Sequence, residues 1–411
     1  METVRYDASL HLNGCLLTWR DAGWLEKGTE KAVEDFIGSG SAVVGIEKGE
    51  VLALATSGSG SIRHCLHPSE LPFCSINSVN VSFHGRKLGF AGSMTACLLA
   101  EAAERGDVCA GLGMFEQGFY DRLGFSNMPY WNSVSLNPSD IALEGNFPSI
   151  PVRLSAESWM EIHRNRTDRY SYHGSVNLSP AMTRAAMEWS ENCFALGFRD
   201  KAGELTHHIF FEKICGENGP AYTGWLVYKN SSQFRDLMLL IKSLGDQIDL
   251  IKIAEPPGVQ IQALLKKPIS GRRIALSKTN DRTETSSLAW TQCRILSLEG
   301  CIRGMVCPGE SCSFNLRLHD PIKDHRESST GWRGCSGDYT VHLSDHSRAV
   351  PGLVSGLPMM ECSVNVFTKL WIGSVRPTLI PFTDRIFAST ELLEQVERAI
   401  PMPEPSFDWK L

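Results

Sequence analysis

The sequence predicts an α/β (α+β) protein of more than one domain, in which mixed sheets are flanked by helices. The chain has 411 residues, which is more than one ordinary hydrophobic core accommodates. Along it, apolar residues recur with a period of two in some segments and at helical spacing in others. Three zones rich in proline or polar residues interrupt these patterns, at 146–151, 270–287 and after Ile400.

The N-terminal part predicts a mixed sheet with one long helix. Two short apolar runs separated by Glu47-Lys48-Gly49-Glu50 are typical of a hairpin. The elements that we expect here are strands at 42–46, 51–55, 76–83, 109–114 and 130–136, a helix at 92–105 and a short helix at 118–123. Gly124 follows the short helix, as glycine often does at a helix end.

The rest of the chain continues the alternation of helices and strands. In the middle part we expect helices at 157–164, 179–193 and 232–244 and strands at 208–211 and 223–228. In the last part we expect strands at 293–298, 313–318, 338–343 and 361–365 and a helix at 389–399. Ser389 is a typical N-cap for that final helix, which ends before Pro401.

Composition argues against several classes of partner. The net charge of −6 and the pI near 6.1 do not favour a nucleic-acid binder, which usually carries a basic face. The N-terminus lacks the apolar core of a signal peptide, and no apolar run has the length of a bilayer span. We therefore expect no nucleic-acid partner, no membrane partner and a cytoplasmic location.

Cysteine spacing argues against a metal site. The 13 cysteines include no CxxC pair, and the densest group, Cys301, Cys307 and Cys312, has no histidine at ligand spacing. We expect free thiols and no metal. The lone histidines His64, His67 and His84 are not expected to be catalytic.

The most informative stretch is a strand that runs into a glycine-rich, cationic turn and then into a helix, at residues 79–93. Gly89 and Gly92 allow the backbone to approach a ligand closely. The free N–H groups and the dipole at the helix start favour an anion, and Arg86 and Lys87 add positive charge. The stretch contains neither GxGxxG nor GK[ST], so it predicts an anion site of another kind or a plain structural connection.

Two motifs in this region resemble those of the GNAT acetyltransferase superfamily. Arg86-x-x-Gly89-x-Ala91 matches that superfamily's pyrophosphate-binding pattern, Arg/Gln-x-x-Gly-x-Gly/Ala. About 30 residues further on, Gly118-Phe119-Tyr120-Asp121-Arg122-Leu123-Gly124-Phe125 resembles the second signature, Phe-Tyr-x-x-x-Gly-Phe. The resemblance implies a GNAT fold for the first domain.

The layout of the whole chain resembles the enhanced intracellular survival (Eis) family of acetyltransferases. The stretches that carry this resemblance are 222–228, 234–237, 245–249 and 370–377. It implies tandem GNAT-like domains and a sterol-carrier-protein-like domain. The corresponding ranges are 1–147 for the catalytic domain, 148–287 for a second domain without cofactor motifs, and 288–411 for the last domain, whose tail returns to the active site.

The resemblance implies that the protein binds acetyl-CoA and transfers its acetyl group to a primary amine, which could be a small molecule, an aminoglycoside or a lysine side chain. The pantetheine arm would pair with Val79, Asn80 and Val81. The pyrophosphate would bind at Arg86 and at the run Lys87, Leu88, Gly89, Phe90, Ala91 and Gly92, and Phe115 and Glu116 would line the cofactor near its thiol.

The resemblance also implies the residues that move protons. Tyr120 would be the general acid, because a phenol can protonate a departing thiolate. Residues 76–81 contain no Asp or Glu. The resemblance implies that the base is the terminal carboxylate of Leu411, with the tail anchored by Phe407, Trp409 and Leu411. The alternatives are that Tyr120 only packs under the cofactor and that the terminus is frayed.

Two further expectations concern partners. By resemblance the protein is a homo-oligomer, most simply a hexamer, and the apolar run Leu370-Trp371-Ile372 is expected to be uncovered within one chain. The alternative function is a non-catalytic acyl-CoA or lipid-binding protein that uses the C-terminal domain. An interaction scaffold is compatible with either.

Overall fold

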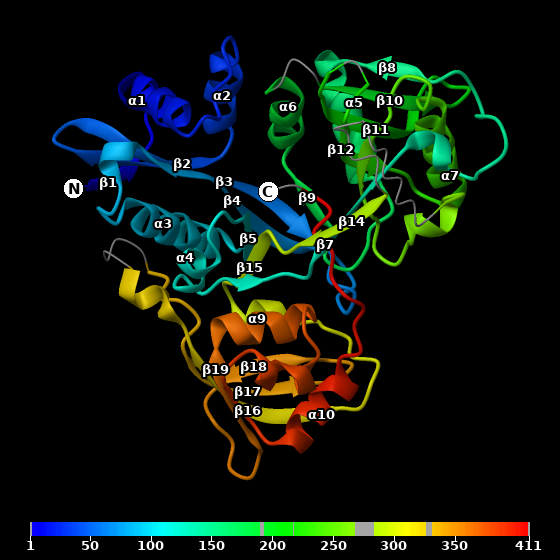
Figure 1. Ribbon diagram of the computed structural model, residues 1–411. Coiled ribbons are helices and arrows are strands. Elements are labelled where there is room, and N and C mark those ends of the chain that lie inside the picture. Colours follow the sequence, from blue (N-terminus) through cyan, green and yellow to red (C-terminus); the bar gives the residue numbers. More distant parts are fainter. Residues whose placement is uncertain (1, 190–192, 217, 268–282, 326–330, 410–411) are drawn as a thin grey trace, which may run out of the picture. The chain divides into compact units, whose positions relative to one another are not determined.

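The computed structural model describes residues 2–189, 193–216, 218–267, 283–325 and 331–409. The chain forms two compact units. Unit 1 comprises Met1–Pro129, Tyr172–Ser179 and Ala289–Leu411, and unit 2 comprises Tyr130–Ser171 and Pro180–Leu288 (Figure 1). Among the described residues, no helix is both long and apolar enough to cross a membrane.

The first sheet of unit 1 has the strand order β1-β2-β3-β4-β5-β15-β6, with β9 paired to β3. Its strands are β1 (Glu2–Arg5), β2 (Ser41–Glu47), β3 (Glu50–Ile62), β4 (Leu71–Val81), β5 (Cys109–Gly113), β6 (Ser126–Asn127), β9 (Val176–Leu178) and β15 (Thr291–Ile295). The predicted hairpin is confirmed as β2 and β3. Strands β4 and β5 are parallel, because the helix α3 (Phe90–Arg105) carries the chain from one to the other.

Helices cover both faces of this sheet. α1 (Ala8–Asp21) and α2 (Glu30–Ile37) lie on one side of β2 and β3, and α3 lies on the other (Figure 1). Met94, Leu98 and Leu99 of α3 are fully buried and pack with Ile76 and Leu112 of the strands. The predicted helix at 92–105 is therefore confirmed, and its apolar face forms the core beneath the candidate site.

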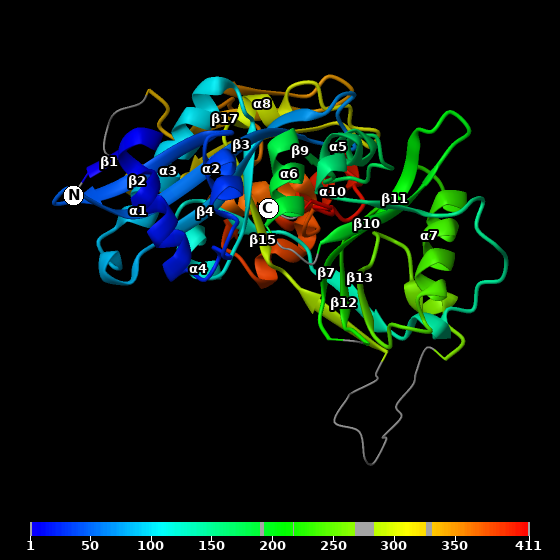
Figure 2. The ribbon, with the colours of Figure 1, turned by 90° about the horizontal axis from the view of Figure 1, so that it is seen from above.

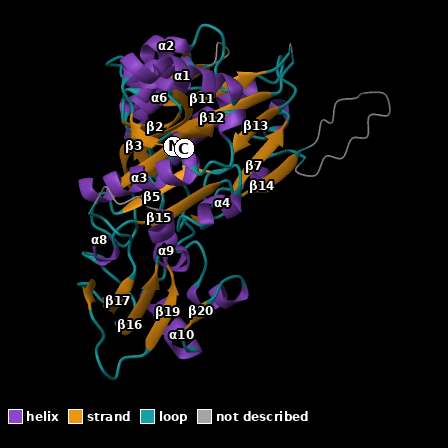
Figure 3. Ribbon diagram, turned by 90° about the vertical axis from the view of Figure 1, so that its left-hand side faces the viewer, coloured by secondary structure: helices purple, strands orange, loops and turns teal. Residues whose placement is uncertain are grey.

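A second sheet of unit 1 is formed by the C-terminal segment, in the order β18-β17-β16-β19-β20. Its strands are β16 (Cys312–His319), β17 (Gly337–Leu343), β18 (Arg348–Pro351), β19 (Met359–Ser363) and β20 (Ile386–Phe387), and its helices are α8 (Leu298–Ile302), α9 (Val364–Ile372) and α10 (Thr390–Ala399). α9 lies between the two sheets of unit 1 (Figure 3). Ser389 caps α10 as predicted, since its side chain accepts a hydrogen bond from the Leu392 N–H.

The strand predicted at 361–365 is shorter than expected. β19 ends at Ser363, whose side chain accepts a hydrogen bond from the Val366 N–H and so caps α9. Asn365 therefore lies in the first turn of a helix instead of in a strand. A serine ahead of an apolar run is also an N-terminal helix signal, and here that signal prevails.

The expectation that Leu370-Trp371-Ile372 is uncovered within one chain is wrong. The three residues are 3%, 1% and 0% exposed. They belong to α9, where the space between the two sheets of unit 1 buries them. This run therefore gives no reason to expect an oligomer.

Unit 2 contains one sheet, in the order β14-β7-β13-β12-β11-β10-β8. Its strands are β7 (Trp131–Leu136), β8 (Val152–Leu154), β10 (Phe194–Arg199), β11 (Leu205–Ile214), β12 (Ala221–Val227), β13 (Ile251–Ala254) and β14 (Glu284–Leu288), and its helices are α5 (Trp159–Thr167), α6 (Pro180–Glu188) and α7 (Ser231–Ser243). α7 lies alongside the sheet (Figure 2) and buries Leu237, Leu240 and Ile241 in the core of the unit.

The strands of one sheet do not all come from one continuous range of the sequence. The strand predicted at 130–136 is present as β7, but it pairs in the sheet of unit 2. β15, from the last part of the chain, pairs with β5 and β6 in the first sheet. Most of the polar zone at 270–287 lies outside the described residues, and the boundaries at 147/148 and 287/288 stay predictions.

Candidate functional site

A cavity of about 780 Å³ in unit 1 brings most of the predicted site residues together. Its lining includes every residue expected to bind the cofactor except Leu88. Those present are Val79, Asn80, Val81, Arg86, Lys87, Gly89, Phe90, Ala91, Gly92, Phe115 and Glu116. Tyr120 lines the same cavity. Leu88 is 43% exposed and does not belong to the lining.

The cavity is located where β4 and β5 part from each other. The two strands pair from Phe73↔Cys109 to Ile76↔Leu112, and β4 then continues to Val81 without β5. A bulge explains this divergence, because the register between β3 and β4 shifts between Leu54 and Thr56, and Ser78 adopts a φ of +52°. Among the described strands, none pairs with residues 77–81 on the β5 side, so this edge offers backbone donors and acceptors to a ligand.

The turn after β4 has the local backbone geometry that an anion site requires. A short 3₁₀ helix at Phe83–Gly85 leads through Arg86 and Lys87 to the start of α3. Lys87 and Gly89 have φ values of +64° and +88°, and this left-handed backbone turns the chain into the helix. No side chain caps α3 at Gly89, so N–H groups of the first turn are left for a ligand.

Gly89 is needed for its conformation more than for space within the protein. A Cβ atom added there would meet no atom within 4 Å. Its positive φ disfavours any other residue, and a bulky side chain would have open space around it next to the cavity. The sequence argument for a close backbone approach at Gly89 therefore agrees with the local geometry.

Tyr120 is held by α4 (Gln117–Asp121), the short helix predicted at 118–123. Its ring makes edge contacts with Phe119 and Phe125, at centroid distances of 4.9 and 6.0 Å. The side chain is 7% exposed, and burial raises the pKa of Tyr120 to about 12. The phenol therefore keeps its proton at neutral pH and can act as a donor.

The side chain of Asn80 is a feature that sequence reasoning missed. Asn80 is 7% exposed, and neither its amide nitrogen nor its amide oxygen has a hydrogen-bond partner among the described residues. A buried amide without a partner costs about 1–3 kcal/mol, and such groups in native proteins call for an explanation. Because Asn80 lines the cavity, a polar group of a bound ligand would satisfy it. Asparagine is rare in strands, which is the signal that could have found it.

The wall formed by the end of α1 was also not anticipated. Asp21, Ala22 and Trp24 line the cavity, and Trp24 stacks on Phe115 with ring centroids 5.8 Å apart. Together with Glu116 they place aromatic and acidic side chains around one space. No sequence motif marks Asp21 or Trp24, since only the fold brings α1 to the cavity.

The C-terminal tail is docked on unit 1 as far as the structure describes it. Phe407 and Trp409 are buried, as the anchoring prediction requires, and Phe407 makes an edge contact with Phe73 of β4 at 6.0 Å. The Asp408 carboxylate accepts hydrogen bonds from the Ser175 hydroxyl and the Val176 N–H, at 3.0 and 3.1 Å. Leu411 lies outside the described residues, so its role as a base stays a prediction.

The other candidate groups lie elsewhere. His84 is on the surface beside Glu50, whereas Nε2 of His64 and of His67 bonds to a backbone carbonyl in the interior. All 13 cysteines are free thiols. No group of three or more His, Cys, Asp or Glu side chains that could hold a metal ion occurs in the part of the chain that the structure describes.

Comparison with known proteins identifies the fold. No protein-family model matches the chain, and no curated protein matches its sequence. Solved structures do match along the whole chain. A probable N-acyltransferase of Enterococcus faecalis V583, a conserved protein of unknown function, superimposes with a TM-score of 0.81 at 12% identity, over 100% of this chain and 99% of that one.

Two further structures give the same result. A GCN5-related N-acetyltransferase from Anabaena variabilis ATCC 29413 matches with a TM-score of 0.78 at 12% identity, over 98% of each chain. Eis1 from Mycobacterium abscessus matches with a TM-score of 0.74 at 14% identity, over 100% of each chain. The chain therefore has the fold of these three proteins, and the predicted α/β class with mixed sheets is confirmed.

Proposed function

We propose that the protein is an acetyl-CoA-dependent N-acetyltransferase that acetylates a primary amine. One observation carries this proposal. The unpaired edge of β4, the uncapped start of α3 and the buried phenol of Tyr120 all border the same cavity. Acetyl transfer requires groups that hold the acyl thioester and a group that protonates the leaving thiolate. The strand edge and the helix start would provide the first, and the phenol would provide the second.

Binding of acetyl-CoA would use the β4 edge that faces away from β3 and the uncapped start of α3. The pantetheine amides would pair with the backbone of Val79–Val81, and the pyrophosphate would bind to the N–H groups of Lys87–Gly92 with charge from Arg86. Phe115 and Glu116 would line the cofactor near its thiol. The unpartnered amide of Asn80 supports this arrangement, because a polar ligand would complete its hydrogen bonds.

The reaction forms an amide bond between the amine nitrogen and the acetyl carbon, and it breaks the thioester C–S bond. A backbone N–H of the β4 edge would polarise the thioester carbonyl. Tyr120 would give its proton to the leaving thiolate, and the Leu411 carboxylate would accept the proton of the amine, directly or through a water. Docking of the tail up to Trp409 supports the role of Leu411.

The acceptor would be a protonated amine, either a small molecule, an aminoglycoside-like compound or a lysine side chain. Asp21 and Glu116 place carboxylates on the cavity, and the stacked rings of Trp24 and Phe115 offer an aromatic surface. Carboxylates and aromatic faces both attract cations. The chemistry of this wall therefore suits a cationic acceptor.

The test combines binding with turnover. Calorimetry should show binding of acetyl-CoA to the full-length protein, and release of free CoA thiol should be measured with a panel of primary amines. We expect thiol release that depends on at least one amine. Tight acetyl-CoA binding without release for any amine would favour the alternative of a non-catalytic acyl-CoA-binding protein.

The family resemblance also leads us to propose a cytoplasmic homohexamer. Resemblance alone supports this assembly, because the run 370–372 is covered within the chain. Light scattering at micromolar concentration should give a particle several times the 45.4 kDa mass of one chain. A 45.4 kDa particle would contradict the hexamer without bearing on the chemistry.

A further inference from the structure

The helix that carries Tyr120 is too short to hold its own position. α4 has five residues, Gln117–Asp121, whereas isolated helices below about 12 residues are marginal in water. The turn that follows it, residues 121–125, exposes the carbonyl groups of a helix end, which need partners. Three of these carbonyls are bound by side chains from the C-terminal segment, more than 160 residues further along the chain.

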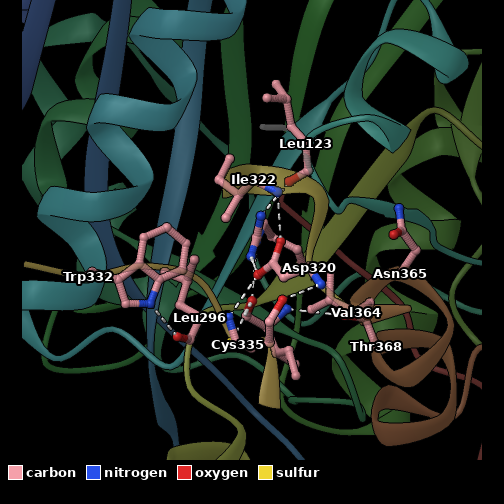
Figure 4. A network of polar contacts seen from close by, with 12 residues as sticks. Leu123, Leu296, Asp320, Ile322, Trp332, Cys335, Val364, Asn365 and Thr368 are labelled. Carbon is pink, nitrogen blue, oxygen red and sulfur yellow. Dashed lines mark hydrogen bonds and ion pairs between the residues drawn. The ribbon is translucent and has the colours of Figure 1, made fainter. Parts of the chain in front are cut away.

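Arg294 of β15 provides the first of these contacts. Its side chain is fully buried, its Nη1 donates to the Leu123 carbonyl, and its Nη2 donates to Oδ2 of Asp320 at 2.6 Å. Leu123 and Asp320 are labelled in Figure 4. Asp320 also accepts hydrogen bonds from the N–H groups of Ile322 and Cys335, at 3.0 and 2.9 Å. A buried arginine with so many partners has one allowed position, so it fixes the turn that it contacts.

Asn365, in the first turn of α9, provides the second and third contacts. Its Nδ2 donates to the carbonyl of Asp121 at 2.9 Å and to the carbonyl of Phe125 at 2.5 Å. Asp121 is the residue after Tyr120, and the ring of Phe125 packs edge-on against the Tyr120 ring. One amide group therefore holds the backbone of Asp121, next to Tyr120, and the backbone of Phe125, whose ring packs against Tyr120.

Close packing at Gly124 shows that the turn is clamped. A Cβ atom there would lie 2.8 Å from Nη1 of Arg294 and 2.8 Å from Cγ1 of Val364 in α9. Both distances are far below van der Waals contact. The guanidinium and α9 thus close on the turn from two sides, and small displacements of either would move α4.

We propose that Arg294 and Asn365 are positioning residues, which hold the hydroxyl of Tyr120 where it can protonate the leaving thiolate. This inference rests on the proposed function. A general acid must lie within hydrogen-bond reach of the atom that it protonates, and a misplacement of about 1 Å can cost roughly 100-fold in rate. The C-terminal segment then takes part in catalysis through the turn 121–125, although neither residue lines the cavity.

The test uses two variants with the same chemistry at different places. Asn365→Asp keeps the shape of the side chain and removes the donors to Asp121 and Phe125. Asn315→Asp is the matched control, because the amide of Asn315 also donates to two backbone carbonyls, those of Val354 and Leu357, but within the C-terminal segment. We expect Asn365→Asp to lower kcat by about 10- to 100-fold with the KM for acetyl-CoA unchanged, and Asn315→Asp to keep the native kcat.

A double variant separates positioning from general damage. In a Tyr120→Phe background the proton of the phenol is already lost, so Asn365→Asp should lower kcat little further. Arg294→Lys, which keeps the charge that faces Asp320 but not the fork that reaches Leu123, should behave like Asn365→Asp. An equal loss of kcat from Asn365→Asp with and without Tyr120 would overturn the proposal.

A readout without turnover distinguishes a failure of this inference from a failure of the proposed function. Fluorotyrosine can replace the eight tyrosines, and the ¹⁹F resonance that disappears in Tyr120→Phe is that of residue 120. This resonance should shift in Asn365→Asp and Arg294→Lys and stay in place in Asn315→Asp. An unshifted resonance in both folded variants overturns the positioning role, whereas a shift in a protein that acetylates no amine leaves that role standing and removes the proposed function.

Discussion

His64 stacks on Trp371 with ring centroids 4.9 Å apart, and its Nε2–H donates to the backbone carbonyl of Trp371 at 2.9 Å. His67 and His173 lie against the same imidazole at 5.2 and 4.9 Å and bond to the carbonyls of Cys301 and Ile372. The three rings connect the segments 63–67 and 172–175 to α8 and α9. Burial lowers the pKa of His64 to about 3 and also lowers the pKa of His67 and His173, so burial favours the neutral imidazoles.

This cluster predicts a loss of stability in acid. The folded-state pKa values lie below the ordinary 6.5 of the unfolded chain, so the unfolded state binds more protons in the interval between them. The contribution of the three histidines to the free energy of unfolding is fully present above about pH 6.5, and it decreases as the pH falls from about 6.5 toward 3. Thermal unfolding measured between pH 7.5 and 4.5 should show a falling Tm, and His64→Phe should flatten that dependence. Equal slopes for the two proteins would contradict a role of the cluster.

Gly89 gives a test of where acetyl-CoA binds. Gly89→Trp should abolish binding in calorimetry, because the indole would have open space next to the cradle and the positive φ would be strained. Gly106→Trp is the matched control at the other end of α3, since Gly106 also has a positive φ, of +100°, and no atom within 4 Å of an added Cβ. Native affinity in Gly89→Trp would place the cofactor elsewhere.

Gly124 gives a test of the clamp on the Tyr120 turn. Gly124→Ala forces a Cβ to within 2.8 Å of Arg294 and Val364 at a φ of +86°. We expect a destabilisation of about 1–3 kcal/mol in urea unfolding and a lower kcat in the folded fraction. Gly304→Ala is the control, because it has a φ of +81° and no atom within 4 Å of the new Cβ, so it introduces the backbone strain alone. An equal loss of unfolding free energy at both positions would exclude the clamp.

The tail gives a test of the base. Adding a few residues after Leu411 moves the terminal carboxylate without changing any side chain, so kcat should fall by about 10²- to 10⁴-fold. Docking of Phe407 and Trp409 should persist, which the near-ultraviolet circular dichroism difference between the native protein and Trp409→Phe, measured with and without the extension, can report. A native rate in the extended protein would assign the base to another group.

The sequence alone predicts those parts of the site whose residues are neighbours in the chain. The cradle from Arg86 to Gly92 and the helix of Tyr120 are local motifs, in which glycine conformation, charge and helix start follow from neighbouring residues. The helix α3 and the hairpin of β2 and β3 were predicted for the same reason. At Asn365 two local signals compete, and the serine cap of α9 prevails over the strand pattern.

The remaining parts depend on contacts that no local pattern encodes. Asp21 and Trp24 reach the cavity only because α1 packs on the sheet, and Arg294 reaches the Tyr120 turn only because β15 pairs with β5 and β6. From the sequence alone, an arginine in a strand such as Arg294 is expected at the surface. Its burial is explained only by its ion pair with Asp320. Tertiary pairing over long sequence separations therefore sets the wall of the cavity and the position of Tyr120.

The most direct measurement for the central claim is the kinetic comparison of Tyr120→Phe with the native protein, at saturating acetyl-CoA and amine. The substitution removes one proton donor and little volume, so kcat for amine-dependent thiol release should fall by about 10²- to 10⁴-fold, while calorimetry shows unchanged affinity for acetyl-CoA. A native kcat in Tyr120→Phe would contradict the account, because the phenol on the cavity would then have no part in acetyl transfer.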